Sequence, residues 1–399
     1  MKIAIIAGHF MPEIGYQEVY LARAFARLGH DVRIVTSNVP SPSGRNIVKK
    51  SYDVGVSQDR KYGFSIFRLG VVFKYGTAVL CAGLEDSLRE ISPDLVVVVG
   101  VGKLFPYPIL KERGNRKYKL VLLLGDNSDM YDRSSFRLRV KTKLIQKIIK
   151  NRIYRKGISA SDRVFLYTRE TEQIVNSYIP RSLREELQSK KIITSLGFDP
   201  EEYFYDVKER DVIRKELRIS SNDIVYITST RIYPRKKIER VVDEISSLRS
   251  KGIGAHYIII GFLGDSYDKQ LREYIFSKGN SEAFHCYGFM KHHEIRKYFN
   301  AADIGVWINP AISIQEGMGT GLKVILENKL SVNHLVTEGA NGWYFEKGEI
   351  DSAIGRSAKQ MLLKSSEERN IERVRLAKTN YDRLSYDGIA RELLESTFH

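Results

Sequence analysis

The chain has 399 residues, of which 43% are hydrophobic and 28% are charged. These proportions are typical of a globular protein and exclude a disordered chain, and a chain of this length favours two domains. Cys81 and Cys286 lie far apart in the sequence, which excludes a disulfide framework and favours a reducing, cytoplasmic compartment. No apolar run approaches the roughly 18 residues that a membrane-spanning helix needs.

Basic residues outnumber acidic ones, 64 against 48, and the formal charge is +16 at pH 7. Such an excess predicts an anionic partner, which can be a nucleic acid, an anionic membrane or a phosphorylated ligand, unless the charge serves solubility alone. The excess is concentrated locally, because the segment from Arg137 to Lys156 holds nine Lys and Arg residues and no acidic one. A specific anionic partner is therefore favoured.

The first half of the chain alternates short apolar segments with helical patterns. Residues 2–7 are predicted to form a strand, 17–28 an amphipathic helix and 31–36 a strand. Further strands are predicted at 65–69, 94–99, 119–124 and 163–167. Strand–helix–strand units with short connections predict a parallel sheet with right-handed crossovers.

A second series of the same kind begins near Asp223. Strands are predicted at residues 224–230, 256–261, 284–288 and 303–308, and helices at 238–248, 268–277, 293–299 and from 315. The chain is therefore predicted to be an α/β protein with two Rossmann-like domains, at 1–195 and 196–382, whose parallel sheets face a central cleft. A C-terminal helix at about 383–399 is expected to pack back on the first domain. In such sheets, ligands bind beyond the carboxyl ends of the strands.

Six segments carry sequence motifs in a fixed order. They are residues 9–37 (HFMPEIGYQEVYLARAFARLGHDVRIVTS), 160–171 (ASDRVFLYTRET), 195–204 (SLGFDPEEYF), 230–242 (TRIYPRKKIERVV), 301–325 (AADIGVWINPAISIQEGMGTGLKVI) and 338–345 (EGANGWYF). In this order they resemble the loops and hinge of glycosyltransferase family 4, the glycosyl transferases group 1, which has the GT-B fold.

The resemblance implies a metal-independent glycosyltransferase of the hexosyltransferase type. It implies that the first domain binds the acceptor and that the second binds a nucleotide-sugar donor, which is UDP- or GDP-linked. The sugar is expected to pass, with retention of configuration, to a hydroxyl of a saccharide or lipid-linked acceptor in cell-surface glycan (polysaccharide) or glycolipid biosynthesis. No cofactor beyond this co-substrate and no metal ion are expected.

The donor diphosphate is predicted to lie at Arg231 and Lys236, just after the first strand of the second domain. An Arg offers a bidentate fork and a Lys a point charge, so two such cations across a loop can clamp a diphosphate. The alternative is a solvated basic turn, since Arg235 and Lys237 also lie here. Lys237 occupies a position where the resembled family usually has glycine.

The following strand ends add further candidate donor contacts. Gly261 and Gly264 would let the backbone approach a ligand closely, although two glycines at this spacing often form only a turn. The backbone at Phe289 and Met290, after the next strand, is a candidate for hydrogen bonding to the nucleobase.

Glu316 opens a predicted helix, and the resemblance implies that it binds the nucleotide ribose. A carboxylate accepts hydrogen bonds from two vicinal hydroxyls, but an acidic residue is also favoured in the first turn of any helix. The peptide between Ser313 and Ile314 is a candidate phosphate contact at the start of this helix.

One departure from the resembled family concerns the donor sugar. The partner glutamate expected eight residues before Glu316 is replaced by Ile308, and the segment from Asp303 to Glu316 is shorter than usual. This departure keeps two alternatives open, a non-catalytic GT-B-like protein that binds a nucleotide or lipid, and a GT-B-like nucleotide-sugar epimerase.

Three residues are candidates on the acceptor side. Gly15 is expected to contact the phosphate or the acceptor, although Tyr16 replaces the family's second glycine. His9 is a lone histidine at a strand end and is equally compatible with a structural hydrogen bond. Asp126, after the strand at 119–124, is a candidate catalytic residue that accepts the proton of an acceptor hydroxyl, or else caps a turn.

The basic segment from Arg137 to Gly157 combines its cations with a stripe of Leu, Ile and Val. A basic amphipathic helix suits an anionic membrane, whereas the alternative is a core-packed helix with a solvated basic face. The membrane hypothesis assigns contacts to Lys141, Lys143, Lys147 and Lys150 and places the protein peripherally on the inner face of the membrane. No nucleic-acid partner is predicted, because no nucleic-acid-binding motif accompanies the charge.

Overall fold

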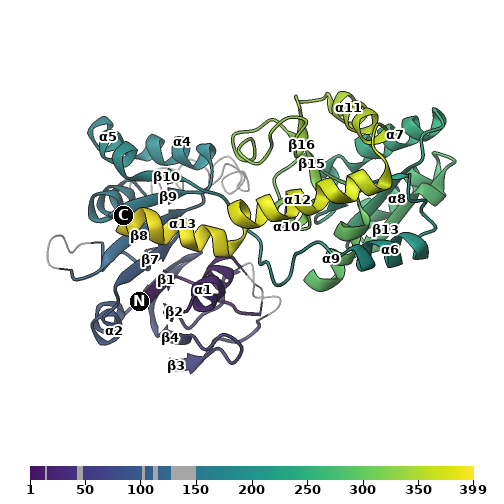
Figure 1. Cartoon of the computed structure of the whole chain (residues 1–399). Helices are drawn as coiled ribbons and strands as arrows, with labels where there is room; N and C mark the ends of the chain where they lie inside the picture. Colours follow the sequence, from purple (N-terminus) through teal and green to yellow (C-terminus); the bar gives the residue numbers. More distant parts are fainter. Residues whose placement is uncertain (14–15, 43–47, 101–103, 111–115, 127–149) are drawn as a thin grey trace, which may run out of the picture. The chain divides into compact units, whose positions relative to one another are not determined.

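The computed structural model describes residues 1–399 except 14–15, 43–47, 101–103, 111–115 and 127–149, and it forms two compact units (Figure 1). The first unit is Met1–Leu196 together with Tyr386–His399, and the second is Gly197–Ser385.

The first unit is built on an eight-stranded sheet in the order β10-β9-β8-β7-β1-β2-β4-β3. The strands are β1 (Lys2–Ala7), β2 (Asp31–Ser37), β3 (Gly55–Gln58), β4 (Ser65–Leu69), β7 (Leu95–Val99), β8 (Lys119–Leu124), β9 (Arg163–Leu166) and β10 (Lys191–Ile193). All neighbours are parallel except β3 and β4. The central strands are apolar at almost every position, because both of their faces are buried.

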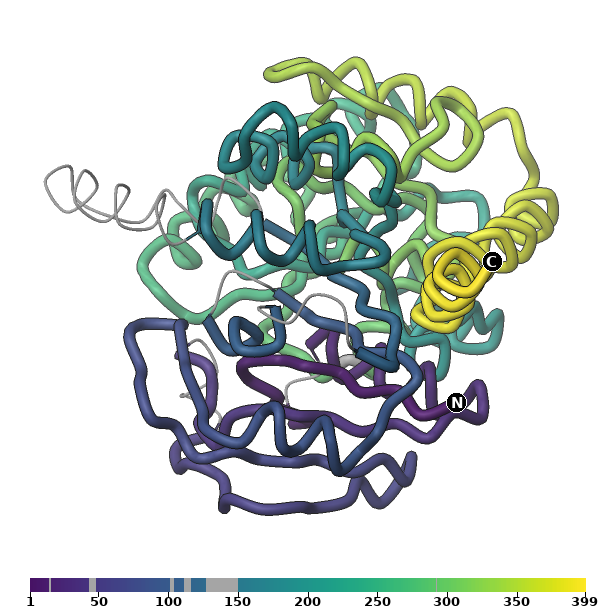
Figure 2. The backbone as a smooth tube through the Cα atoms, turned by 90° about the vertical axis from the view of Figure 1, so that its left-hand side faces the viewer, coloured from purple at the N-terminus to yellow at the C-terminus, as the bar shows by residue number. Residues whose placement is uncertain are grey.

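The helices of this unit are α1 (Gln17–Arg27), α2 (Leu84–Ile91), α4 (Arg169–Tyr178), α5 (Arg181–Lys190) and α13 (Tyr386–Phe398). The last helix, α13, packs beside α1, so both chain ends belong to the first unit (Figure 1, Figure 2). The rings of Tyr20 and Tyr386 stack with centroids 5.5 Å apart, and Arg27 donates to Asp387 at 2.6 Å. These contacts fasten the C-terminal helix to α1.

A separate antiparallel hairpin follows β4 in the first unit. It consists of β5 (Val71–Tyr75) and β6 (Ala78–Cys81), and Val79 and Cys81 pack into the core of the unit. The sequence did not predict this hairpin or β3. β3 and β5 lack the alternation of a half-buried strand, because several of their apolar residues face solvent, and β6 is only four residues long.

The second unit has a six-stranded parallel sheet in the order β13-β12-β11-β14-β15-β16. Its strands are β11 (Ile224–Ser229), β12 (Ala255–Phe262), β13 (Phe284–Gly288), β14 (Ile304–Trp307), β15 (Lys323–Glu327) and β16 (Gly342–Phe345). Its helices are α6 (Val207–Glu216), η4 (Pro234–Lys236), α7 (Ile238–Ser250), α8 (Ser266–Phe276), η5 (Ser281–Ala283), α9 (His292–Ala301), α10 (Ser313–Gly319), α11 (Ile350–Leu362) and α12 (Ser366–Leu384).

A buried aspartate joins the two central strands of the second unit to a helix. Asp303 directly precedes β14, and its Oδ2 accepts a hydrogen bond from the Val225 amide of β11 at 2.8 Å. Its carboxylate also forms ion pairs with Arg210 and Arg214 of α6, each with an N–O distance of 2.6 Å. All three side chains are at most 6% exposed. Burial by itself raises the pKa of Asp303, but the charges of Arg214 and Arg210 outweigh it and hold this pKa well below its ordinary value.

The same arginines cap the C-terminal end of α9. Arg210 Nη1 donates to the carbonyls of Asn300, Ala301 and Ala302 at 3.1–3.2 Å. Arg373 of α12 donates to the Phe299 carbonyl at 2.5 Å and also to the Ala302 carbonyl. The last carbonyls of a helix have no partners within the helix and carry partial negative charge, so these guanidinium groups satisfy and stabilise them.

The predicted fold class is confirmed, because both units are Rossmann-like with parallel sheets. Each strand predicted from the sequence is present, with boundaries that differ by one or two residues. No helix in the described part of the chain is long and apolar enough to cross a membrane.

We expect Asp303→Asn to lower the free energy of unfolding of the second unit by about 3–5 kcal/mol, because Arg210 and Arg214 would stay buried without their counter-charge. Urea denaturation followed by circular dichroism measures this change. Glu282→Gln is the matched control, since Glu282 pairs with Arg249 at 2.6 Å but is 64% exposed. That control should cost at most about 1 kcal/mol, and equal losses in the two variants would contradict the assigned role of Asp303.

Candidate functional site

Each sheet has a topological switch point, where consecutive connections leave to opposite sides. In the first unit it lies between β1 and β7, and in the second between β11 and β14. Ligands of open α/β sheets bind outside the carboxyl ends of the strands at such points. The predicted site residues His9 and Arg231 follow β1 and β11, and Glu316 lies beyond β14.

His9 has a structural role at the end of β1. It is 5% exposed, its Nδ1 lies 3.1 Å from the Val39 carbonyl, and its Nε2 lies 3.2 Å from the Thr77 carbonyl. The ring therefore ties the end of β1 to the segment after β2 and to the turn between β5 and β6. Gly15, the other residue expected in this loop, lies outside the described residues.

Asp126 is engaged by neighbouring side chains rather than open to an acceptor. Its carboxylate accepts from Lys150 Nζ at 2.8 Å and from the Tyr154 hydroxyl, and its side chain is 16% exposed. Its carbonyl accepts from the Thr171 hydroxyl at 3.0 Å. In this geometry the carboxylate anchors residues 150–154 to the end of β8.

The described end of the basic segment is a helix at residues 150–160. Ile153 and Tyr154 are buried in the core of the first unit. Lys150 is only 13% exposed and pairs with Asp126, so it is an internal ion-pair partner and not the membrane contact that the sequence predicted. Lys141, Lys143 and Lys147 lie outside the described residues.

The loop after β1 is held by residues that the sequence analysis missed. Arg68 of β4 is buried and donates to the Phe10 carbonyl at 3.2 Å, and its guanidinium carbon lies 3.4 Å from the centre of the Tyr52 ring. The Tyr52 hydroxyl in turn donates to Glu13 at 2.9 Å. Burial and this bond to Glu13 raise the pKa of Tyr52. These contacts join residues 16 to 58 positions apart, and no local sequence pattern marks them.

In the second unit, the loops after β11 and β14 are fastened to each other. The Ser229 carbonyl at the end of β11 accepts from the Ser313 hydroxyl at 2.5 Å and from the Trp307 indole N–H at 3.1 Å. The Asn309 amide donates to the Arg235 carbonyl at 2.6 Å. The two loops that flank the switch point therefore form one connected unit. The sequence analysis assigned no role to Trp307 or Asn309.

The two predicted diphosphate ligands lie in the loop after β11 but in different environments. Arg231 is exposed, whereas Lys236 is 8% exposed in η4 and holds its ammonium 5.5 Å from the centre of the Tyr233 ring. A buried lysine is held in place by its surroundings, while an exposed arginine can adjust to a ligand. The predicted pair of cations therefore lies in one loop at the switch point.

Gly261 is required by the backbone and not only by a ligand. Its φ is +121°, and a Cβ at this position would lie 1.8 Å from the Thr230 carbonyl oxygen. Gly264 has a φ of +81°, and its N–H donates to the carboxylate of Asp268 at 2.5 Å, as does the N–H of Leu263. The amide of Gly264, which was expected near a ligand, is thus satisfied by the side chain of Asp268 in α8 (Ser266–Phe276).

Glu316 is 7% exposed in the first turn of α10. The neighbouring Ile314 N–H donates to the Ala311 carbonyl at 3.2 Å, and the Ser313 side chain is bound to β11. The Ser313–Ile314 peptide predicted to contact a phosphate is therefore part of a closed turn, and Glu316 lies buried in the helix that follows it.

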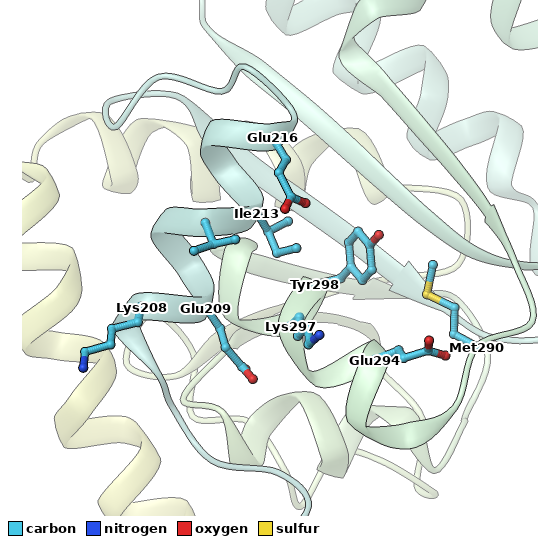
Figure 3. Close-up of a pocket in the computed structure, with 9 residues that line it drawn as sticks. Lys208, Glu209, Ile213, Glu216, Met290, Glu294, Lys297 and Tyr298 are labelled. Carbon is cyan, nitrogen blue, oxygen red and sulfur yellow. The ribbon is translucent and has the colours of Figure 1, made fainter.

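A groove of about 470 Å³ lies between α6 and α9, next to the end of β13 (Figure 3). Figure 3 shows Ile213 from α6 and Tyr298 from α9 on opposite sides of it, with Met290 at one end. Met290, predicted to help read the nucleobase, thus lines a partly apolar groove, while Phe289 beside it is 85% exposed.

Residues 209–377 match the family model described as Glycosyl transferases group 1. The second unit contains a glycosyl transferases group 1 domain. This match confirms the predicted resemblance to glycosyltransferase family 4 for the second unit. No curated protein sequence is significantly similar to the chain.

Solved structures with the GT-B fold match the whole chain at low sequence identity. A sucrose-phosphate synthase from Thermosynechococcus elongatus matches with a TM-score of 0.64 and 14% identity, over 99% of this chain and 97% of that one. HepE from Anabaena, solved with UDP, matches with a TM-score of 0.65 and 15% identity, over 99% of both chains. WaaG, a glycosyltransferase involved in lipopolysaccharide biosynthesis, matches with a TM-score of 0.57 and 14% identity, over 99% of both chains.

Two departures from the family have a structural basis in the group 1 domain. Lys237, where the family usually has glycine, adopts the left-handed region with a φ of 50° at the start of α7. Ile308, where the family usually has glutamate, is 8% exposed and packs into the apolar core. The first departure strains the backbone locally, and the second removes a carboxylate from the carboxyl end of β14.

We expect Lys237→Gly to stabilise the group 1 domain by about 1 kcal/mol, because glycine adopts the left-handed conformation without the steric cost of a Cβ. The midpoint of urea denaturation measures the effect. Arg240→Gly, at an exposed position within α7, is the control and should instead cost about 1 kcal/mol. A decrease of similar size in both variants would show that the backbone at residue 237 is not strained.

Proposed function

We propose that the chain transfers a sugar from a UDP- or GDP-linked donor to a hydroxyl of a saccharide or lipid-linked acceptor, with retention of configuration. The supporting observation is the β11–β14 switch point of the group 1 domain. There Arg231 and Lys236 share one loop, this loop is hydrogen-bonded to the loop after β14, and the buried Glu316 follows.

The proposed work of Arg231 and Lys236 is electrostatic. When the glycosidic bond to the nucleotide breaks, negative charge develops on the departing diphosphate, and preorganised cations lower the energy of that state. Removing one such group typically lowers the catalytic rate by a factor of about 10²–10³. Glu316 would accept hydrogen bonds from the ribose hydroxyls. The similarity to HepE, which was solved with UDP-glucose, supports a UDP-linked donor.

We assign no protein side chain as the general base. Asp126, the carboxylate expected near the acceptor, is occupied by Lys150 and Tyr154. A mechanism with retention can use an oxygen of the departing phosphate to take the acceptor proton, while the enzyme supplies positioning and charge. We also propose that the reaction needs no metal ion, because the two cations would neutralise the diphosphate.

The proposed acceptor lies at a membrane surface, in the synthesis of a cell-surface glycan or glycolipid on the inner face of the membrane. The basic segment from Arg137 to Lys156 supports this, since each cation near an anionic surface contributes about 1 kcal/mol. The similarity to WaaG, whose pathway is lipopolysaccharide biosynthesis, is consistent with it.

One observation favours a second candidate, a GT-B protein that binds a nucleotide without turnover. Ile308 points into the core where the family has a carboxylate that meets the donor sugar. Binding without product formation would distinguish this candidate from a transferase.

A nucleotide panel tests the donor site. We expect one of UDP, GDP and ADP, or one of their sugars, to raise the melting temperature, because a ligand at about 100 times its Kd stabilises the folded state by about 2.7 kcal/mol. Arg231→Ala and Lys236→Ala should each abolish this shift, as measured by differential scanning fluorimetry.

The control for the nucleotide panel is Lys251→Ala, an exposed lysine after α7 at the opposite edge of the sheet. It should keep the full shift. Loss of the shift in this control, or no shift for any nucleotide with the parent protein, would overturn the assigned donor site.

Vesicle binding tests the basic segment. We expect replacement of Lys141, Lys143 and Lys147 by Gln to weaken co-sedimentation with vesicles that contain phosphatidylserine by about a hundredfold, because each cation contributes about 1 kcal/mol. Lys208, Lys251 and Lys347, which are exposed on the group 1 domain, form a control triple with the same change of charge. Equal weakening by both triples would contradict a membrane role for the segment.

A further inference from the structure

The first unit carries a group of exposed apolar side chains on two short elements. Val72, Phe73 and Tyr75 of β5 are 68%, 51% and 76% exposed, and Val54 and Val56 at β3 are 62% and 61% exposed. We call these five residues the hairpin patch. Water-exposed apolar side chains of this size and number in one small region indicate a surface that meets another apolar phase.

The two parts of the hairpin patch lie beside each other. A methyl carbon at Gly70, which leads into β5, would lie 3.8 Å from Val54 Cγ2. In the hairpin itself, Lys74 pairs with the buried Val79, whereas Phe73 and Tyr75 pair with Leu80 and Ala78. Opposite residues of an antiparallel pair share a face, so Phe73 and Tyr75 point away from the core.

The turn of the hairpin lies at the carboxyl edge of the sheet. His9, two residues after β1, places its Nε2 3.2 Å from the Thr77 carbonyl in the turn between β5 and β6. This edge is where an α/β sheet binds its ligand. The hairpin patch is therefore fastened beside the place where the proposed function puts the acceptor.

The charge around the hairpin patch identifies its partner. Residues 49–75 hold six Lys or Arg and two Asp. Lys49 and Lys50 before β3 are exposed on the side of the hairpin, whereas Arg68 is buried and Arg60 and Lys61 follow β3 at the amino edge of β4. A projecting apolar surface flanked by exposed cations matches an anionic lipid surface, which accepts apolar side chains below its headgroups and attracts cations at them.

We propose that the hairpin patch inserts into the surface of an anionic membrane and holds the acceptor edge of the first unit at the lipid headgroups. The inference deepens the proposed function, since a lipid-linked acceptor is presented at this level. It is independent of the segment at 137–156, because insertion of apolar side chains persists when salt screens the attraction of cations.

The test compares two triple variants for co-sedimentation with vesicles of phosphatidylcholine and phosphatidylserine. Replacing Val72, Phe73 and Tyr75 by Ser should weaken binding at least about tenfold and remove the binding that persists in high salt. The control triple replaces three apolar residues of the second unit by Ser. They are Phe276, Leu363 and Ile371, whose side chains are 75%, 78% and 65% exposed. It should bind like the parent, and unchanged binding of the hairpin triple would overturn the proposal.

Phe73→Trp gives a direct readout, because Trp307 and Trp343 are 2% and 3% exposed in the second unit. Its emission should shift to the blue with vesicles and be quenched by brominated lipid. If neither the blue shift nor the quenching occurs, the proposal is overturned. Vesicle binding needs no donor, and the nucleotide-induced melting shift needs no vesicle, so failure of this inference and failure of the donor site are distinguishable.

Discussion

The second unit depends on one buried carboxylate, that of Asp303. It stands at the amino end of β14 and is bound to the Val225 amide of the neighbouring β11, so it fixes these two strands side by side. The charge is stable in the interior because Arg210 and Arg214 neutralise it. The same arginines, with Arg373, close the end of α9, so two strands and three helices meet at one ionic cluster.

The ionic cluster at Asp303 also affects the carboxyl ends of β11 and β14. Because β11 and β14 are held together at their amino ends, the loops that follow their carboxyl ends come within hydrogen-bonding distance of each other. Ser229 there accepts from both Trp307 and Ser313, and Asn309 reaches the carbonyl of Arg235. The loops that carry Lys236 and Glu316 are thereby preorganised by contacts that involve neither residue's charge, as the proposed donor site requires.

Sequence reasoning succeeded where the signal is local. The apolar strands, the amphipathic helices and the order of the family motifs are properties of consecutive residues, and they placed Arg231 and Lys236 at the end of β11. It did not reveal that Asp126 and Lys150 form an ion pair. These two residues are 24 positions apart and neutralise each other, a pairing that neither residue's neighbours reveal.

The sequence by itself therefore determined the fold class, the family and the loop that bears the two cations, because strand period and motif order depend on near neighbours along the chain. Only the tertiary structure decided which polar groups are already satisfied, such as His9, Asp126 and the amides at Gly264 and Ile314. It also decided that Ile308 faces the core and that Phe73 and Tyr75 face water. The physical reason is that burial and hydrogen bonding are set by residues far apart in the sequence, which meet only when the sheets form.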